Sequence, residues 1–128
     1  MKRIVYIVSF IVIIGLAVNL LENRAGQDTG LAKEIDSLLK KGETQIDLTR
    51  LTNFKWTQVS LFGPYTTDES IEDLMNIEFK GDNGGIDLLD DRFLLVFANE
   101  KHAVKTVVLS RKHGTYTIKD NRLLVVDR

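Results

Sequence analysis

The feature that most constrains this chain of 128 residues is an uninterrupted apolar segment near its N-terminus. Residues 4–21 carry no charged side chain, Lys2 and Arg3 precede them, and Glu22 follows. As a helix with a rise of ~1.5 Å per residue, the segment is ~27 Å long, close to the ~30 Å thickness of a bilayer's hydrocarbon core. The sequence therefore predicts a single transmembrane helix, and the basic residues before it predict a cytoplasmic N-terminus.

A cleaved signal peptide is the alternative interpretation of the same segment. Gly15, Leu16 and Ala17 offer the small residues of a cleavage site, but the apolar run continues to Leu21. An uncleaved helix would make this a single-pass protein of a bacterial cell membrane with residues 22–128 outside the cytoplasm. Cleavage would instead release a secreted protein. The chain contains no cysteine, which excludes a lipid-anchored lipoprotein, disulfides and thiolate chemistry.

Three regions are expected: a membrane anchor over 1–21, a polar linker over 22–30, and an extracytoplasmic α+β domain over 31–128. Leucines and an isoleucine recur at helical spacing after residue 30, which predicts a helix over 31–41. Asp28 or Thr29 can cap its start, and Gly42 ends it. A short edge strand near Ile46, a turn and a strand over 56–62 are expected next.

The stretch GPYTTDE at residues 63–69 marks a break between that strand and a second helix. Pro64 suits the first corner of a turn, and Thr66 followed by Glu69 has the spacing of a helix capping box. Ile71, Leu74 and Met75 predict the apolar face of the helix. The alternative interpretation is a functional elbow in which Tyr65 and Thr67 line a ligand cleft.

The C-terminal part reads as an antiparallel β-meander, with strands over 92–98, 103–111 and 122–127. Residues 93–97 are apolar on both faces, so both faces need a cover from this chain or from a partner. The predicted fold class is α+β. It consists of an N-terminal transmembrane helix followed by a small domain with an antiparallel β-meander and two helices packed on one face.

Charge is segregated along the chain. Residues 68–91 hold nine acids against one base, Lys80, whereas residues 92–128 hold eight bases against three acids. The two segments can pair with each other, or the acidic segment can bind a basic protein. The candidate partner-binding face comprises five residues: Tyr65, Thr67, Glu69, Glu72 and Asp73. A nucleic-acid partner is not expected, because the bases are not interleaved with aromatic residues. The sequence does not determine the oligomeric state.

Catalysis, a metal and a cofactor are not expected. His102 and His113 fall in predicted turns, and the serines at 37, 60, 70 and 110 follow no nucleophile-elbow pattern. Glu69, Glu72 and Asp73 could be imagined as paired catalytic carboxylates, but acids on a surface helix are more often solvated. A calcium loop counted from Asp82 would place Phe93 at position twelve, where a carboxylate is required.

One series of residues resembles a group of small bacterial envelope proteins, membrane-anchored or lipoprotein-like, that have no assigned activity. The series consists of Trp56, Phe62-Gly63-Pro64-Tyr65-Thr66 and Leu94-Leu95-Val96-Phe97. The resemblance implies an envelope location and an anchored domain. This chain departs from many of those proteins because it lacks a lipobox cysteine.

These observations predict a non-enzymatic, membrane-anchored extracytoplasmic protein that binds a protein partner as an accessory of the bacterial envelope. An immunity-type protein that neutralises a toxin is the alternative, for which small size and an acidic patch are apt. A small hydrolase is the least favoured interpretation.

Overall fold

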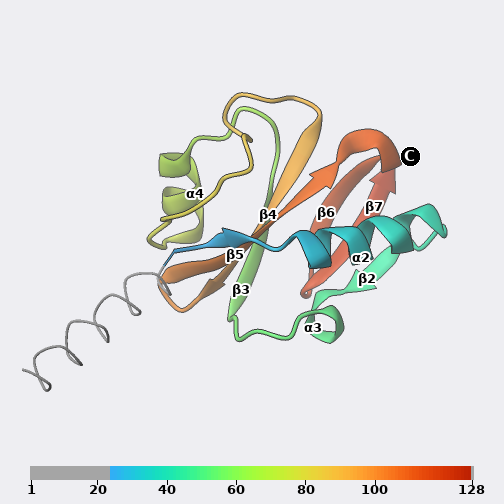
Figure 1. The fold of residues 1–128 in the computed structure, drawn as a ribbon, viewed down its shortest axis with the longest axis horizontal. Coiled ribbons are helices and arrows are strands. Elements are labelled where there is room, and N and C mark those ends of the chain that lie inside the picture. Colours follow the sequence, from blue (N-terminus) through green and yellow to red (C-terminus); the bar gives the residue numbers. More distant parts are fainter. Residues whose placement is uncertain (1–23, 128) are drawn as a thin grey trace, which may run out of the picture.

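The computed structural model describes residues 24–127, and the predicted membrane anchor over residues 4–21 lies outside them (Figure 1). Within the described residues, no helix combines the length and apolar content that crossing a membrane requires. The predicted α+β class is confirmed, because the described residues combine α-helices with two sheets, one mixed and one antiparallel.

The first sheet has the order β1-β5-β4-β3. It contains β1 (Gly26–Gln27), β5 (His102–Ser110), β4 (Arg92–Asn99) and β3 (Gln58–Phe62). β3, β4 and β5 pair antiparallel in succession, whereas β1 joins the edge of β5 in parallel. The strands expected over 56–62, 92–98 and 103–111 are therefore confirmed, with small shifts at their ends.

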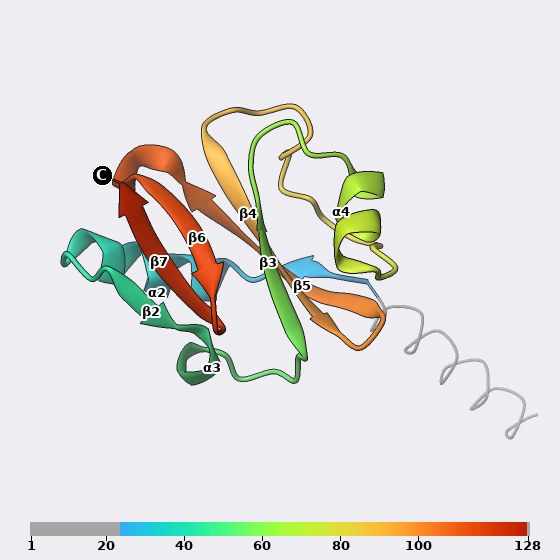
Figure 2. The ribbon, with the colours of Figure 1, turned by 180° about the vertical axis from the view of Figure 1, so that it is seen from behind.

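The second sheet has the order β2-β7-β6, as Figure 2 shows. It contains β2 (Gln45–Asp47), β7 (Arg122–Asp127) and β6 (Thr115–Lys119). The prediction of one continuous meander is wrong here, because the chain leaves the first sheet after Ser110 through the short 3-10 helix η1 (Arg111–His113). Asp120 and Asn121, both at positive φ, form the tight turn that joins β6 to β7.

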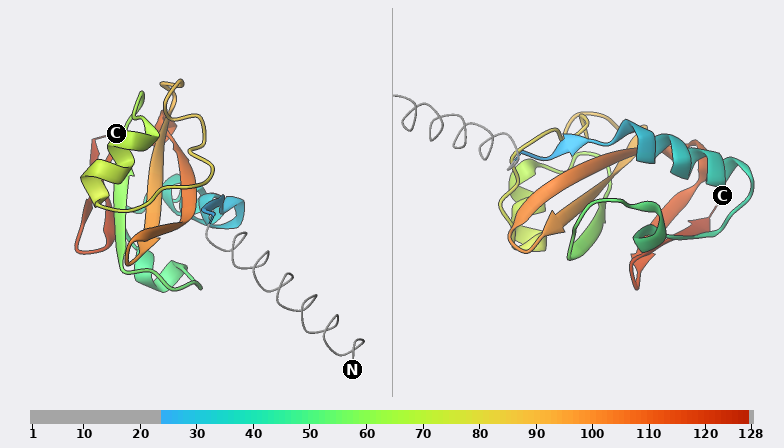
Figure 3. Two further views of the ribbon diagram at one scale, coloured as in Figure 1. Left: turned by 90° about the vertical axis from the view of Figure 1, so that its left-hand side faces the viewer. Right: turned by 60° about the horizontal axis from the view of Figure 1, so that its bottom comes forward.

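The described part of the chain forms three α-helices: α2 (Thr29–Lys40), α3 (Leu48–Leu51) and α4 (Asp68–Met75). The Asp28 carboxylate accepts a hydrogen bond from the Leu31 N–H and caps α2, as expected. Gly42, at φ 93°, follows its C-terminal end. The prediction that two helices pack on one face is wrong, because α2 and α4 lie on opposite sides of the first sheet (Figure 3).

The two faces of β4 explain this arrangement. Phe93, Leu95 and Phe97 pack into a core cluster with α2 and the second sheet. Leu94 and Val96 point the other way, into a cluster with α4 and with the segment over 77–86. The prediction that both faces of residues 93–97 are covered is confirmed, because all five side chains are buried. Both covers come from this chain, so the strand needs no partner to bury it.

Residues 22–30 were expected to form a polar linker, but within the described residues part of this stretch is paired with the domain. Ala25 is buried, and its N–H donates to the Lys80 carbonyl oxygen at 2.7 Å. Gly26 and Gln27 then pair with Lys105 and Thr106 of β5. An edge strand has unpaired backbone groups, and residues 25–27 satisfy those of β5, so this stretch belongs to the domain.

Candidate functional site

The predicted partner-binding residues lie on α4 and on the loop that leads into it. Thr67 is the N-cap of α4, and its hydroxyl oxygen accepts the Ser70 N–H at 3.2 Å. The expected capping box at Thr66 and Glu69 is therefore wrong. Thr66 instead donates its hydroxyl hydrogen to the Gly63 carbonyl oxygen at 2.7 Å, which holds the turn before the helix. Thr67 therefore holds the start of α4 through its hydroxyl oxygen.

Tyr65 is held in an unusual backbone conformation and presented to solvent. Its φ is 65°, in the left-handed region that is costly for a residue with a Cβ, and 63% of its surface is exposed. Its N–H donates to the Ile86 carbonyl oxygen at 2.6 Å. This bond joins the loop over 63–67 to the loop over 86–91, and the phenol ring is left accessible to a partner.

The three predicted acids on α4 have different roles. Glu72 accepts a hydrogen bond from the Phe79 N–H at 3.1 Å, so it holds the segment after the helix in place. Glu69 and Asp73 are exposed, and within residues 24–127 their carboxylates form no hydrogen bond or ion pair. Only these two of the three are available for a partner without loss of an internal contact.

Three exposed leucines escaped the sequence prediction. Leu74 was expected on the buried face of α4, but 75% of its surface is exposed. Leu88 and Leu89, in the loop that the Tyr65 N–H contacts through Ile86, are also exposed. No periodic signal marks a loop leucine as exposed, because its direction depends on the turn. We call four exposed residues of α4 and of the loop before it, Tyr65, Glu69, Asp73 and Leu74, the α4 surface.

Only some of the acids in residues 68–91 form ion pairs with bases in residues 92–128 or within their own segment. Glu78 lies 2.8 Å from Lys80 and 3.4 Å from Nδ1 of His102, and Asp91 lies 2.8 Å from Nε of Arg92. The hydrogen bond and charge of Lys80 hold the pKa of Glu78 below its ordinary value. The acids of the α4 surface take no part in these pairs.

The two histidines do not share a site. His102 neighbours Glu78, whereas Nε2 of His113 lies 2.7 Å from Oδ1 of Asp36 on α2. The part of the chain that the structure describes contains no group of three or more metal-ligating side chains. Asp82 and Asn83 each accept the N–H two residues ahead, from Gly84 and Gly85, so these loop residues serve the turn.

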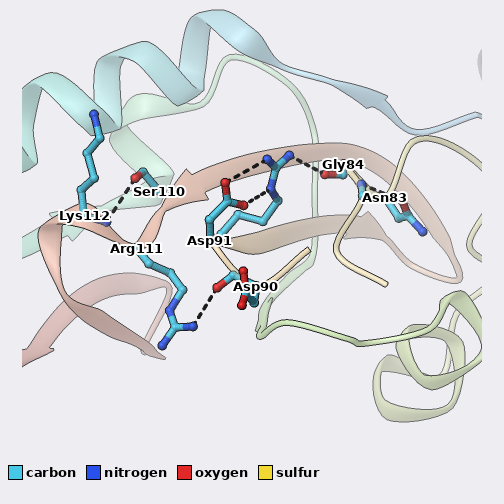
Figure 4. Close-up of polar contacts among 9 residues, drawn as sticks. Asn83, Gly84, Asp90, Asp91, Ser110, Arg111 and Lys112 are labelled. Carbon is cyan, nitrogen blue, oxygen red and sulfur yellow. Dashed lines mark hydrogen bonds and ion pairs between the residues drawn. The ribbon is translucent and has the colours of Figure 1, made fainter. Parts of the chain in front are cut away.

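A second candidate site is a cleft of about 330 Å³ between α2 and the adjoining ends of β4 and β5. Its lining residues are Ala32, Lys33, Asp36, Leu39, Asp91, Arg92, Val108, Leu109 and Ser110. Figure 4 shows the polar contacts beside it, with Lys112 and Arg111 pointing to opposite sides. The sequence did not predict this cleft, because its walls come from distant segments of the chain.

Two acids in the cleft are already paired. The Asp36 carboxylate lies 3.0 Å from the Lys40 ammonium as well as 2.7 Å from His113. The hydrogen bond from Lys40, and then that from His113, hold the pKa of Asp36 below its ordinary value. The Arg92 guanidinium likewise lowers the pKa of Asp91. Both carboxylates are therefore ionised and neutralised by neighbouring bases near neutral pH.

Most of the residues on which the resemblance to envelope proteins rests pack in or against the hydrophobic core. The Trp56 and Phe97 rings meet edge to face at 5.2 Å, and the Trp56 indole N–H donates to the Thr52 hydroxyl. Phe62 and Leu94 are buried in the cluster that α4 covers. Tyr65 is the exception, since it is exposed.

No protein family, curated protein or solved structure matches this chain.

Proposed function

We propose that this chain is a non-enzymatic, membrane-anchored extracytoplasmic protein that binds a protein partner through the α4 surface. The observation that carries the proposal is the combination of uncommitted acids and exposed leucine on one short helix. Glu69 and Asp73 have no internal contact in the described part of the chain, and Leu74 beside them is 75% exposed. Exposed apolar side chains within a polar surround are typical of protein interaction sites.

Two further observations support this surface. Tyr65 keeps a costly backbone conformation while its ring stays exposed, and such outliers occur more often at functional positions. The apolar faces of β4 are both covered by the chain itself, so a partner is not needed to bury this strand and the exposed side chains of α4 are the better candidates. The acids favour a partner with basic side chains, since opposite potentials accelerate and orient association.

The membrane anchor strengthens this function. A protein confined to a membrane surface meets other proteins there at a raised effective concentration, so a modest interface is sufficient. The partner in this proposal is another envelope protein for which the chain acts as an accessory. A secreted toxin is the alternative partner, and the identity of the captured protein distinguishes the two.

Site-specific photo-crosslinking of the full chain in living cells tests the proposal. A photoreactive amino acid placed at Leu74 should capture a partner, whereas the same group at Val126 should not. Val126 is a matched control because 65% of its surface is exposed and it lies on β7 in the second sheet. The same group at Tyr65 serves as a second position on the α4 surface. Equal capture from Leu74 and Val126, or no capture from either Leu74 or Tyr65, would contradict the proposal.

Charge reversal supplies the second arm of the test. Glu69→Lys with Asp73→Lys should abolish the crosslink from Leu74 and lower the melting temperature only slightly. Neither carboxylate forms a hydrogen bond or ion pair within residues 24–127, but Glu69 lies in the first turn of α4, where a lysine opposes the helix dipole. Glu72 must be left intact, since it accepts the Phe79 N–H. Glu34→Lys with Asp127→Lys is the control, as both positions are exposed and lie outside α4.

A further inference from the structure

The cleft between α2 and the ends of β4 and β5 has the size and lining of a small-molecule site. Its volume of about 330 Å³ lies at the lower end of the range for ligand pockets. Ala32 and Leu39 from α2 and Val108 and Leu109 from β5 provide an apolar wall. Leu39 and Leu109 are already buried in the core, so a ligand with a short aliphatic portion would exclude water mainly from the half-buried Ala32 and Val108.

The polar groups around this wall offer more free donors than free acceptors. The Arg92 guanidinium has five N–H groups and donates to Asp91 through Nε and Nη2 and to the Gly84 carbonyl oxygen through Nη1. Two N–H groups of Arg92 stay uncommitted, one on each terminal nitrogen. The contacts to Asp91 and Gly84 fix the orientation of the guanidinium, and Figure 4 marks the contacts at both of these residues.

Lys33 and Ser110 add to these donors. Within residues 24–127 the Lys33 ammonium forms no ion pair. The Ser110 oxygen accepts the Lys112 N–H at 3.1 Å, which leaves its hydroxyl hydrogen free to donate. The two carboxylates of the cleft already have positively charged or hydrogen-bonding partners. Asp36 is bound by Lys40 and His113, and Asp91 is bound by Arg92.

We propose that this cleft binds a small organic carboxylate with a short aliphatic tail. The carboxylate accepts hydrogen bonds from Lys33, Arg92 and Ser110, and charge-assisted bonds of this kind are stronger than neutral ones. The tail packs on Ala32 and Val108, beside the buried Leu39 and Leu109. A cationic ligand finds no unpaired carboxylate in the cleft, and an inorganic anion leaves the apolar wall exposed to water.

Titration of the full chain in zwitterionic lipid nanodiscs, followed by amide NMR shifts, tests the proposal with hexanoate as the probe. Hexanoate should shift the amide signals of residues that line the cleft, with Val108 and Ser110 among them. Hexylamine, which has the same tail and the opposite charge, should not shift them. Inorganic phosphate should bind more weakly than hexanoate, because it has no tail.

A matched pair of variants completes the test. Lys33→Glu should weaken hexanoate binding about tenfold or more, as expected for loss of a charged hydrogen-bond donor. Lys55→Glu makes the same charge change at an exposed residue outside the cleft and should leave binding unchanged. Equal shifts with hexylamine, an unchanged affinity in Lys33→Glu, or shifts scattered over the surface would overturn the proposal. This test is independent of the α4 surface, so its failure leaves the protein-binding proposal standing.

Discussion

Nε2 of His113 lies 2.7 Å from Oδ1 of Asp36, although 77 positions separate the two residues along the chain. The contact joins the short helix after β5 to α2. Asp36 is ionised because Lys40 and His113 stabilise its charge, and an ionised carboxylate only accepts hydrogen bonds. Nε2 of His113 therefore carries the hydrogen, and this pair fastens α2 to the connection between the two sheets.

The lowered pKa of Asp36 predicts an acid-dependent loss of stability. The unfolded chain binds the proton at the ordinary pKa, and the folded chain binds it only at lower pH. The stabilisation is present above the unfolded pKa and is lost as the pH falls through the folded value. Asp36→Asn should lower the melting temperature near neutral pH, and the difference from the unmodified chain should shrink at about pH 3.

Thermal unfolding at a series of pH values checks this prediction. Asp73→Asn is the control, since that carboxylate has no internal contact in the described residues. A difference between Asp36→Asn and the unmodified chain that stays constant down to the lowest pH would show that the carboxylate's charge is not what stabilises the contact.

The cap of α4 predicts a difference between two substitutions at one residue. Thr67→Ala should lower the free energy of unfolding by about 1 kcal/mol, because the Ser70 N–H loses its acceptor. Thr67→Ser keeps a hydroxyl oxygen in the same place and should be nearly neutral. Urea denaturation measures both, and equal losses in the two variants would show that the methyl group matters and the cap does not.

The backbone at Tyr65 predicts that stability and binding can be separated. Tyr65→Gly relieves a left-handed conformation that costs about 1–2 kcal/mol, which offsets the greater freedom of glycine in the unfolded chain. The variant should be at least as stable as the unmodified chain, yet it should lose capture of the partner. Tyr65→Phe should preserve the fold and tests whether the hydroxyl contributes to binding.

Two glycines near the isolated bridge between Ala25 and Gly81 predict opposite outcomes. A Cβ at Gly81 would collide with the Ala25 carbonyl oxygen, and Gly81 has a φ of 150°. A Cβ at Gly26, next to Ala25, would meet nothing within 4 Å. Gly81→Ala should therefore lower the melting temperature strongly and detach residues 25–27, whereas Gly26→Ala should change it little. Differential scanning fluorimetry measures the melting temperature of both variants. A large decrease in Gly26→Ala would contradict the prediction that the close contact at Gly81 sets the difference.

The charge flanks of residues 4–21 predict the topology of the full chain. Protease added to intact spheroplasts should digest residues 22–128, and an N-terminal tag should stay protected and bound to the membrane. A cytoplasmic marker protein controls for leakage. Recovery of a soluble domain that starts at Val18 would instead establish cleavage of a signal peptide.

Local patterns in the sequence predicted the elements that depend on neighbouring residues. The uninterrupted apolar run over residues 93–97 identified a strand buried on both faces, and the spacing of Leu31, Ile35 and Leu39 identified α2 with its Asp28 cap. These features follow from periods of two and 3.6 residues and from hydrogen bonds that span three or four positions. At α4 the same reasoning predicted the helix but assigned its N-cap to Thr66 and not to Thr67. The two threonines have the same side chain, and the turn before the helix decides which hydroxyl reaches the helix N-terminus.

The tertiary structure decided everything that joins distant segments. A helix's own periodicity shows which of its sides is buried but not which face of a sheet it covers, so the sequence placed α2 and α4 on one face when they lie on two. The pairing of residues 25–27 with β5, the division of the meander into two sheets, and the contact of His113 with Asp36 are likewise long-range. Local periodicity indicated the buried positions of the regular elements, with Leu74 as an exception, whereas chain topology determined which surfaces face each other. Only the packing of the whole domain selects among equally apolar faces.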